Sequence, residues 1–298
     1  MKITDFVIVE IGREKGASAL YYSGLTDEIM KKLLIEALPL GNPENKVFKI
    51  ITFDDELFLS SLLLANNEDH GYALIVKLNA EDLKLNPIGF LNSMNNVLST
   101  ILKDDNNTYL KELNLEYTAP EFTTAAYENF DNFIFSVLTQ QKTLVVGEQE
   151  ELRNFLANLY EYIPDELKRH ITLIANSSNL TNNVSLHALP VTDEVLKIID
   201  GKQGEYTVLF LPMKTAYGTF TSPFCKKIAE LFAEQKKESI KEELMQFFKL
   251  AIESSDIIPP ADFASQQNMS LADASLLLWM RSNHFEIEVQ KSLLEQLQ

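Results

Sequence analysis

Two side chains at the start of an expected helix come nearest to a nucleophile in this sequence. Ser222 and Cys225 flank Pro223, and the N-terminus of a helix lowers the pKa of a thiol. Neither residue lies in the Gly-x-Ser-x-Gly pattern of a hydrolase or beside a histidine that could act as its base. Cys225 is also the single cysteine, so no disulfide can form within the chain. We therefore expect a buried structural thiol rather than a reactive one.

The four histidines do not form a metal-binding pattern. They are His70, His170, His187 and His284, and no two of them have the spacing of three or four residues that a helical metal pair needs. His70 follows Asp69 in an acidic loop, but this loop lacks the full ligand pattern of a calcium site. We expect a solvated turn at His70, and neither a metal nor a cofactor in the chain.

One turn has the position of a phosphate-binding loop without its chemistry. Gly147-Glu148-Gln149-Glu150 stands between an apolar strand and a helix, where phosphate loops occur. The turn lacks the Gly-Lys-Ser/Thr sequence of such loops, and its carboxylates would repel a phosphate. Acidic side chains at the start of a helix instead complement the helix dipole. We expect a tight turn that binds no nucleotide.

Arg13 is the candidate catalytic residue. It lies in the loop Gly12–Gly16, between the two strands of an expected hairpin. An exposed arginine on a short loop can reach into the phosphate site of a partner protein as an arginine finger. The alternative is an ordinary solvated charge beside Glu14 and Lys15.

The composition favours a folded protein that binds other proteins. Hydrophobic residues make up 46% of the chain, and the formal net charge is −17. Such a charge repels nucleic acids and anionic membranes, so we expect neither nucleic-acid binding nor direct membrane insertion. It serves either solubility alone or the attraction of a basic partner surface. The single cysteine, the absence of a signal peptide at Met1–Asp5 and the lack of an apolar run of about 20 residues predict a cytoplasmic protein.

The spacing of hydrophobic residues predicts both helices and strands, and therefore an α/β fold. These helices and strands, which position the residues above, fall into two groups along the chain. In the first group we expect a hairpin of strands 2–11 and 17–23, a helix from Thr26 to before Pro39, strands 46–53, 57–64 and 72–78, and a helix 87–102. Pro87 suits the first position of that last helix. The residues 103–108 read as a loop.

The second group begins near Pro120 and ends in helices. We expect a helix 122–138, a strand 143–147, a helix 150–162, strands 171–175, 184–189 and 206–212, and a helix 193–199. The first two of these strands and the helix between them form a β-α-β unit, which implies a parallel pair. A long helical stretch 224–254 follows, with a charged middle that is either solvated or a break. Pro259-Pro260 reads as a linker before helices that begin near Ser270 and at Phe285.

The order of the elements resembles that of two known modules. Hairpin, helix, three strands and long helix across residues 1–102 resemble the longin fold, a profilin-like α/β sandwich. The segment from Phe135 to Ser178 resembles the centre of a DENN module. The resemblance rests on a helix end, a strand, a turn and a second strand, which are Phe135-Ser136-Val137-Leu138, Thr143-Leu144-Val145-Val146-Gly147, Tyr162-Ile163-Pro164 and Ile171–Ala175. Over about residues 1–250 the chain is similar to the folliculin-like longin–DENN proteins.

This resemblance implies a longin-like domain 1–105, a DENN-like α/β domain 120–255 and a C-terminal helical segment 261–298. DENN-type proteins regulate small GTPases, mostly as guanine nucleotide exchange factors. Folliculin-like members instead activate GTP hydrolysis through an arginine of the longin domain, or scaffold GTPase complexes. Arg13 is the one arginine in the longin-like half of this chain.

We therefore expect a regulator or scaffold of a small GTPase of the Ras superfamily that acts by protein–protein interaction, as a monomer or as a homo- or hetero-dimer. The partner would contact the helix 87–102 and the open strand edges. The alternative is an assembly subunit of a cytosolic complex with no GTPase role, held by helix pairing around Trp279 and Phe285. An enzyme with a cryptic site is a third class, and no motif supports it.

Overall fold

The computed structural model describes residues 1–12, 16–37, 47–53, 56–64, 70–79, 81–103, 111–120, 126–139, 141–168, 171–175, 180, 185–201, 204–253 and 260–284. These residues form a mixed α/β protein whose C-terminal region is helical. The chain divides into two compact units. Unit 1 comprises Met1–Phe122 and Ile171–Pro190, and unit 2 comprises Thr123–His170 and Val191–Gln298. The predicted domains are contiguous, whereas unit 1 takes in a stretch that follows part of unit 2 in the sequence.

Within the ten-stranded mixed sheet that the described residues form, the strands of unit 1 have the order β10-β9-β4-β5-β6-β2-β3. Its strands are β2 (Phe6–Gly12), β3 (Gly16–Ser23), β4 (Phe48–Phe53), β5 (Glu56–Leu64), β6 (His70–Leu78), β9 (Leu173–Ala175) and β10 (Leu186–Pro190). From β4 to β3 every neighbouring pair is antiparallel, whereas β9 and β10 are parallel. The predicted hairpin and the three strands that follow its helix are confirmed, except that Lys2–Ile3, predicted as part of the first hairpin strand, form a separate short strand.

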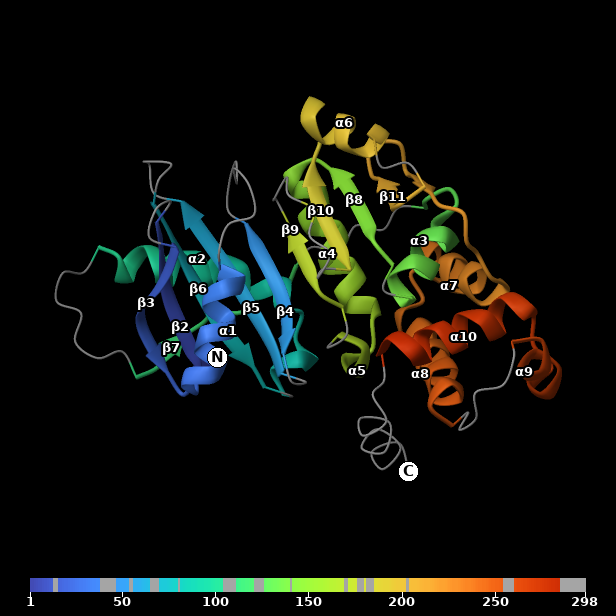
Figure 1. The fold of residues 1–298 in the computed structure, drawn as a ribbon, viewed down its shortest axis with the longest axis horizontal. Coiled ribbons are helices and arrows are strands. Elements are labelled where there is room, and N and C mark those ends of the chain that lie inside the picture. Colours follow the sequence, from blue (N-terminus) through green and yellow to red (C-terminus); the bar gives the residue numbers. More distant parts are fainter. Residues whose placement is uncertain are drawn as a thin grey trace. The chain divides into compact units, whose positions relative to one another are not determined.

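Two helices cover opposite faces of this sheet (Figure 1). The first is α1 (Asp27–Ala37), and the second begins as a 3-10 turn η2 (Pro87–Phe90) and continues as α2 (Leu91–Ile101). Leu33 of α1 packs in one hydrophobic cluster with Leu62 of β5. The adjacent Ser61 donates a hydrogen bond to Asn95 of α2 at 2.6 Å. Since neighbouring side chains in a strand point to opposite faces, α1 and α2 lie on different sides.

A small second sheet completes unit 1. It pairs β1 (Lys2–Ile3) with β7 (Leu113–Asn114) in antiparallel register. The sequence did not predict this pair. Leu113 and Leu115 are buried, and the residues between and beside them are exposed. This alternation is the signature of a strand with one buried face.

Unit 2 contains β8 (Thr143–Gly147), β11 (Thr207–Phe210) and β12 (Thr215–Tyr217). β8 and β11 are parallel, and β11 and β12 are antiparallel. The predicted parallel pairing of the strands 143–147 and 171–175 is wrong. β9 has β10 on one edge and β4 on the other, so neither edge is left for β8.

The predicted helix 122–138 begins later than expected, as α3 (Phe130–Leu138). Residues 121–125 lie outside the described part of the chain. Glu128 instead bridges to Thr215 of β12, and its N–H and carbonyl bond to Lys214 and Ala216. Asn129 then has a φ of 53°, a left-handed conformation that cannot continue a helix backwards.

The remaining α-helices of the described residues belong to unit 2. They are α4 (Gln149–Tyr162), α5 (Asp165–Lys168), α6 (Asp193–Gly201), α7 (Pro223–Ala233), α8 (Lys237–Glu253), α9 (Pro260–Gln267) and α10 (Leu271–His284), and a 3-10 turn η1 (Asp82–Lys84) lies in unit 1. The charged middle of the stretch 224–254 is a break, because Gln235 has a φ of 59°. Pro260 was predicted as linker but opens α9, where proline suits the first turn.

Aromatic side chains form the centre of unit 2. Phe130 and Phe133 of α3 stack with ring centroids 5.2 Å apart, and Phe155 of α4 meets Phe133 edge-on at 5.5 Å. Phe232 of α7 adds a contact with Phe130 at 4.8 Å. Such pairs stabilise by about 0.5–1.5 kcal/mol beyond the burial of their area. No described helix has both the length and the hydropathy to cross a membrane.

Candidate functional site

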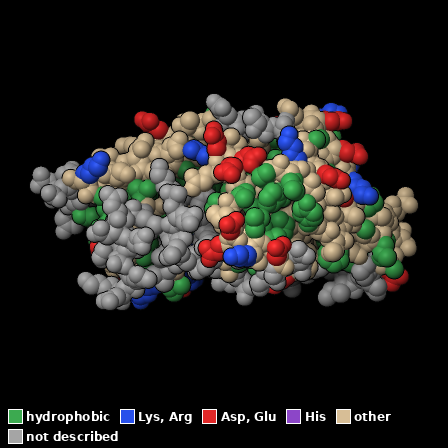
Figure 2. All heavy atoms as spheres, turned by 90° about the horizontal axis from the view of Figure 1, so that it is seen from above, with side chains coloured by type: hydrophobic (Ala, Val, Ile, Leu, Met, Phe, Trp, Pro, Cys, Tyr) green, Lys and Arg blue, Asp and Glu red, His purple; other side chains and the backbone are tan. Residues whose placement is uncertain are grey.

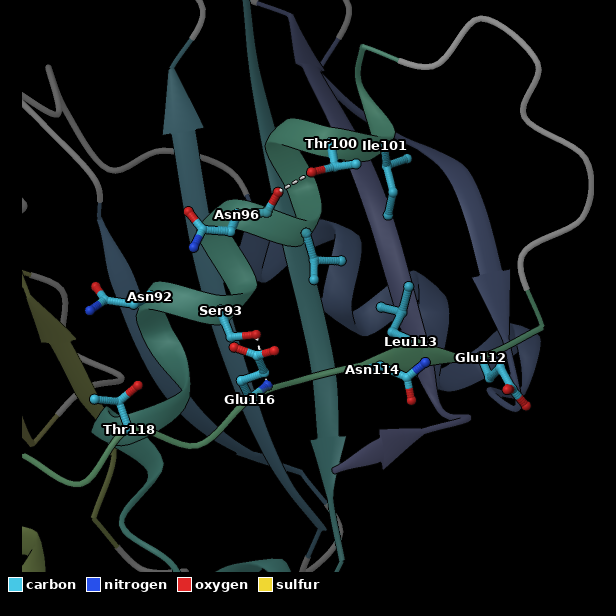
Figure 3. A pocket seen from close by; sticks show the side chains of 11 residues that line it. Asn92, Ser93, Asn96, Thr100, Ile101, Glu112, Leu113, Asn114, Glu116 and Thr118 are labelled. Carbon is cyan, nitrogen blue, oxygen red and sulfur yellow. Dashed lines mark hydrogen bonds between the residues drawn. The ribbon is translucent and has the colours of Figure 1, made fainter.

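A groove on unit 1 lies along the helix that was predicted to meet a partner. It runs between α2 and the extended segment Glu112–Thr118, which contains β7, and has a volume of about 400 Å³ (Figure 3). We call it the α2–β7 groove. Small-ligand sites in proteins usually have volumes of about 300–1,000 Å³. The groove is therefore large enough to hold several side chains of a bound molecule.

The sequence of α2 explains why its outer face is polar. Asn86 accepts a hydrogen bond from the N–H of Ile88 at 3.2 Å, and Pro87 fixes the first turn. The buried face of α2 consists of Leu91, Met94, Leu98 and Ile101, at helical spacing. This spacing leaves Asn92, Ser93, Asn96 and Thr100 on the side that faces the groove.

The other wall of the groove is held in place by two kinds of contact. On one side, the N–H of Leu115 donates to the carbonyl of Met1 at 2.8 Å, and the α-ammonium group of Met1 donates to the carbonyl of Leu115 at 2.6 Å. On the other side, the N–H of Glu116 donates to the hydroxyl of Ser93 at 2.8 Å, and the N–H of Thr118 donates to the carbonyl of Gly89 at 3.1 Å. The segment is thereby fixed at one end against the start of α2.

Gly89 permits this close approach. A Cβ atom at this position would lie 2.7 Å from the carbonyl oxygen of Thr118 and 2.4 Å from the ring of Tyr117. The same ring packs on Phe90 with centroids 5.2 Å apart. Any other residue at position 89 would therefore push the segment away from the helix.

The charges of the α2–β7 groove are acidic. Glu112 and Glu116 belong to its lining, and no basic side chain of the described residues does. Glu112 forms a salt bridge of 2.6 Å with Lys2, and both side chains are about half exposed, so this pair is weak. The structure records no salt bridge for Glu116 within the described residues, and its side chain is exposed. The groove therefore favours a positively charged ligand.

Arg13, the predicted arginine finger, lies outside the described residues. The strands on both sides of it are defined, and Gly12 pairs with Gly16 across the hairpin. The arginine finger stays a prediction. The open strand edge that was predicted as a partner surface corresponds to β3, whose recorded strand partner is β2.

The turn at Gly147 has the predicted structure. It joins β8 directly to α4, and the N–H of Glu148 donates to the carboxylate of Glu151 at 3.4 Å. The side chain of Leu211 would lie 2.8 Å from a Cβ at Gly147. The turn is thus filled by protein and bordered by carboxylates, and it offers no cradle for a phosphate.

Ser222 and Cys225 have structural roles. The Ser222 hydroxyl accepts the N–H of Cys225 at 3.1 Å and caps α7. The thiol of Cys225 is completely buried, and burial raises its pKa from 9.0 to about 12, against the lowering effect of the Ser222 hydrogen bond. Desolvation therefore outweighs this hydrogen bond, and the thiol is protonated at neutral pH.

The histidines of the described residues lie in different elements. His70 was expected in a turn but is the first residue of β6, where it pairs with Gly12. His187 is buried within β10, His284 ends α10, and His170 lies outside the described residues. No group of three or more potential metal ligands occurs in the described part of the chain.

The surface also carries apolar side chains. In unit 2, Met213, Tyr217 and Phe220 are between 50% and 67% exposed. On the face drawn in Figure 2, hydrophobic side chains gather in a patch that Asp and Glu side chains border. Nothing in the structure identifies what would cover this patch, whereas the α2–β7 groove presents directional hydrogen-bonding groups.

Sequence reasoning found one wall of the groove and missed the other. The apolar spacing of the helix 87–102 predicted α2, and the longin resemblance suggested this helix as a partner surface. The pattern Leu113-Asn114-Leu115 could have revealed the opposite wall, since alternation over a few residues indicates a strand with one buried face. A scan against protein-family models finds no match for this chain, and a search of curated proteins finds no similar one.

Proposed function

We propose that this chain is a longin–DENN-like regulator or scaffold that binds a small GTPase of the Ras superfamily. One observation carries the proposal. A hairpin, a helix, three strands and a second helix follow one another along residues 1–103. The five strands lie next to one another in the order β4-β5-β6-β2-β3 within a larger sheet, and one helix covers each face of this part. This is the order of elements for which the longin resemblance was inferred.

The surface of unit 1 supports a role in protein binding. The outer face of α2 is polar and borders a groove, and β3 lies at one edge of the sheet with uncharged residues from Gly16 to Ser23. Edge strands without charges are natural sites for pairing with a second protein. A partner could contact both features without any change in the core of unit 1.

Thermodynamic linkage defines what such binding would do to a GTPase. A protein that binds the nucleotide-free GTPase more tightly than the loaded form weakens nucleotide binding by the same factor. This is the activity of an exchange factor, and it needs no catalytic side chain. A scaffold would instead discriminate between the GDP- and GTP-bound states. The state that is retained therefore reveals the direction of regulation.

The test is retention of purified Ras-superfamily GTPases on the immobilised full chain. Each GTPase is presented nucleotide-free, with GDP and with a non-hydrolysable GTP analogue. We expect at least one GTPase to be retained in a state-dependent manner. Retention of none of them in any state would remove the proposal, and equal retention in all three states would remove its regulatory part.

A further inference from the structure

Along the segment Glu112–Thr118, successive backbone N–H groups point alternately toward β1 and toward the start of α2. The N–H groups of Thr118 and Glu116 point toward the start of α2, where Gly89 and Ser93 accept them. By the two-residue period of an extended chain, the N–H of Asn114 points to the same side. There it meets the α2–β7 groove, and no hydrogen bond from it is recorded within the described residues.

The pairing of β7 with β1 leads to the same conclusion. Met1 and Leu115 exchange both of their backbone hydrogen bonds, so they form a hydrogen-bonded pair. The next pair in the register, Lys2 with Asn114, must then be a non-hydrogen-bonded pair. The N–H and the carbonyl of Asn114 therefore both point away from β1. Together they form a short open strand edge that faces the groove.

The side chains around this edge differ between the floor and the rim. Leu113 of β7 and Val97 and Ile101 of α2 make up the apolar part of the lining, which forms the floor, and Leu113 points into the groove in Figure 3. The exposed side chains of Asn114 and Glu116 lie at the rim. An extended peptide places alternate side chains on opposite faces, so it can contact floor and rim at once.

We propose that the α2–β7 groove binds an extended peptide segment that adds a strand to the edge of β7 at Asn114. Its apolar side chains contact Val97 and Leu113, and its alternate, basic side chains face Glu116. Among the described residues, the lining of the groove has two carboxylates and no basic side chain, and this favours basic side chains on the peptide. The inference rests on the proposed function, since it names the part of a partner protein that this face receives.

Model peptides test this site on the full chain without any GTPase. The probe is the acetylated and amidated hexapeptide Lys-Val-Lys-Val-Lys-Val, and its counterpart has glutamate in place of lysine. Amide NMR spectra of the labelled protein report the contacts. We expect saturable shifts at Asn114 and Glu116 with the basic peptide and none with the acidic one. Methylation of alternate backbone nitrogens, made in both registers, should abolish binding in at least one register.

Two variants locate the binding. Asn114→Pro removes the N–H that faces the groove and leaves the bonds of Leu115 intact, so we expect affinity to fall about tenfold. Glu116→Lys reverses the charge of an exposed side chain and should weaken binding about fivefold. Glu28→Lys makes the same charge change on α1, where the side chain is 82% exposed, and should bind as the wild type does.

Three outcomes would overturn the inference. They are no saturation by the basic peptide in the millimolar range, equal binding of the acidic peptide, and unchanged affinity in both Asn114→Pro and Glu116→Lys. Because the probe is a peptide, its failure leaves the GTPase retention test unaffected. Conversely, peptide binding without retention of any GTPase would keep the groove as a peptide site and remove the proposed function.

Discussion

Helices α2 and α3 both pack on a sheet, but they differ in what they leave on the surface. α3 buries most of its length, from Phe130 through the run Phe133–Leu138. α2 buries one stripe and leaves amide and hydroxyl side chains such as Asn92 and Asn96 on its outer face. A helix that is apolar nearly all round belongs to a core, whereas a helix with one polar face is available to other molecules. The comparison explains why the candidate site lies on α2.

The largest expected difference between the two helices is in stability. Phe133→Ala removes a fully buried ring from the aromatic cluster and should lower the free energy of unfolding by about 3–5 kcal/mol. Urea unfolding followed by circular dichroism measures this change. A loss below about 1 kcal/mol would show that α3 is not the packed element described above.

The buried thiol beside α3 gives a pH-dependent test of the closed region. Burial raises the pKa of Cys225 to about 12 from 9.0, so the folded state keeps a proton that the unfolded chain releases above pH 9. The contribution of this thiol to stability is complete below pH 9 and is lost as the pH rises toward 12. We expect the stability advantage of wild type over Cys225→Ala to shrink between pH 8 and pH 10. An advantage that grows with pH would contradict this account.

The start of α2 should be less sensitive than the core around α3. Asn86→Ala removes the side chain that caps the turn η2 and should cost about 0.5–2 kcal/mol. Urea unfolding gives the cost, and NMR shifts of Ser93 and Glu116 show whether the groove loosens. A cost as large as that of Phe133→Ala would remove the contrast between the two regions.

The smallest effect is expected on the polar face of α2. Asn96→Ala should change stability by less than about 0.5 kcal/mol, because the side chain is exposed and alanine favours helices. The same unfolding measurement applies. A large loss would mean that this face already supports the fold, so that it is not free to contact a partner.

The sequence predicts those parts of the molecule whose signals are local. The spacing of Met94, Leu98 and Ile101 predicts α2, and Pro87 predicts its start. The start of α3 depends instead on Glu128, which pairs with a strand that follows it by more than eighty residues. No local pattern encodes such a pairing, so the predicted helix was too long.

The site was half predictable for the same reason. α2 was predicted from its own residues. The opposite wall of the groove is placed by the pairing of β7 with β1, which lies over a hundred residues away in the sequence. The edge at Asn114 follows from the register of that pair and from the contacts of Glu116 and Thr118 with the start of α2. Neither the register nor these contacts can be read from the alternation of Leu113 and Leu115 alone.

The most direct test of the central claim is whether a small GTPase binds at the outer face of α2. A GTPase retained by the wild-type chain is titrated, in its preferred nucleotide state, against Asn96→Arg and against the control Glu28→Lys. We expect Asn96→Arg to weaken binding at least about tenfold while Glu28→Lys binds like the wild type. Retention of no GTPase in any nucleotide state, or equal affinity for both variants, would contradict the claim.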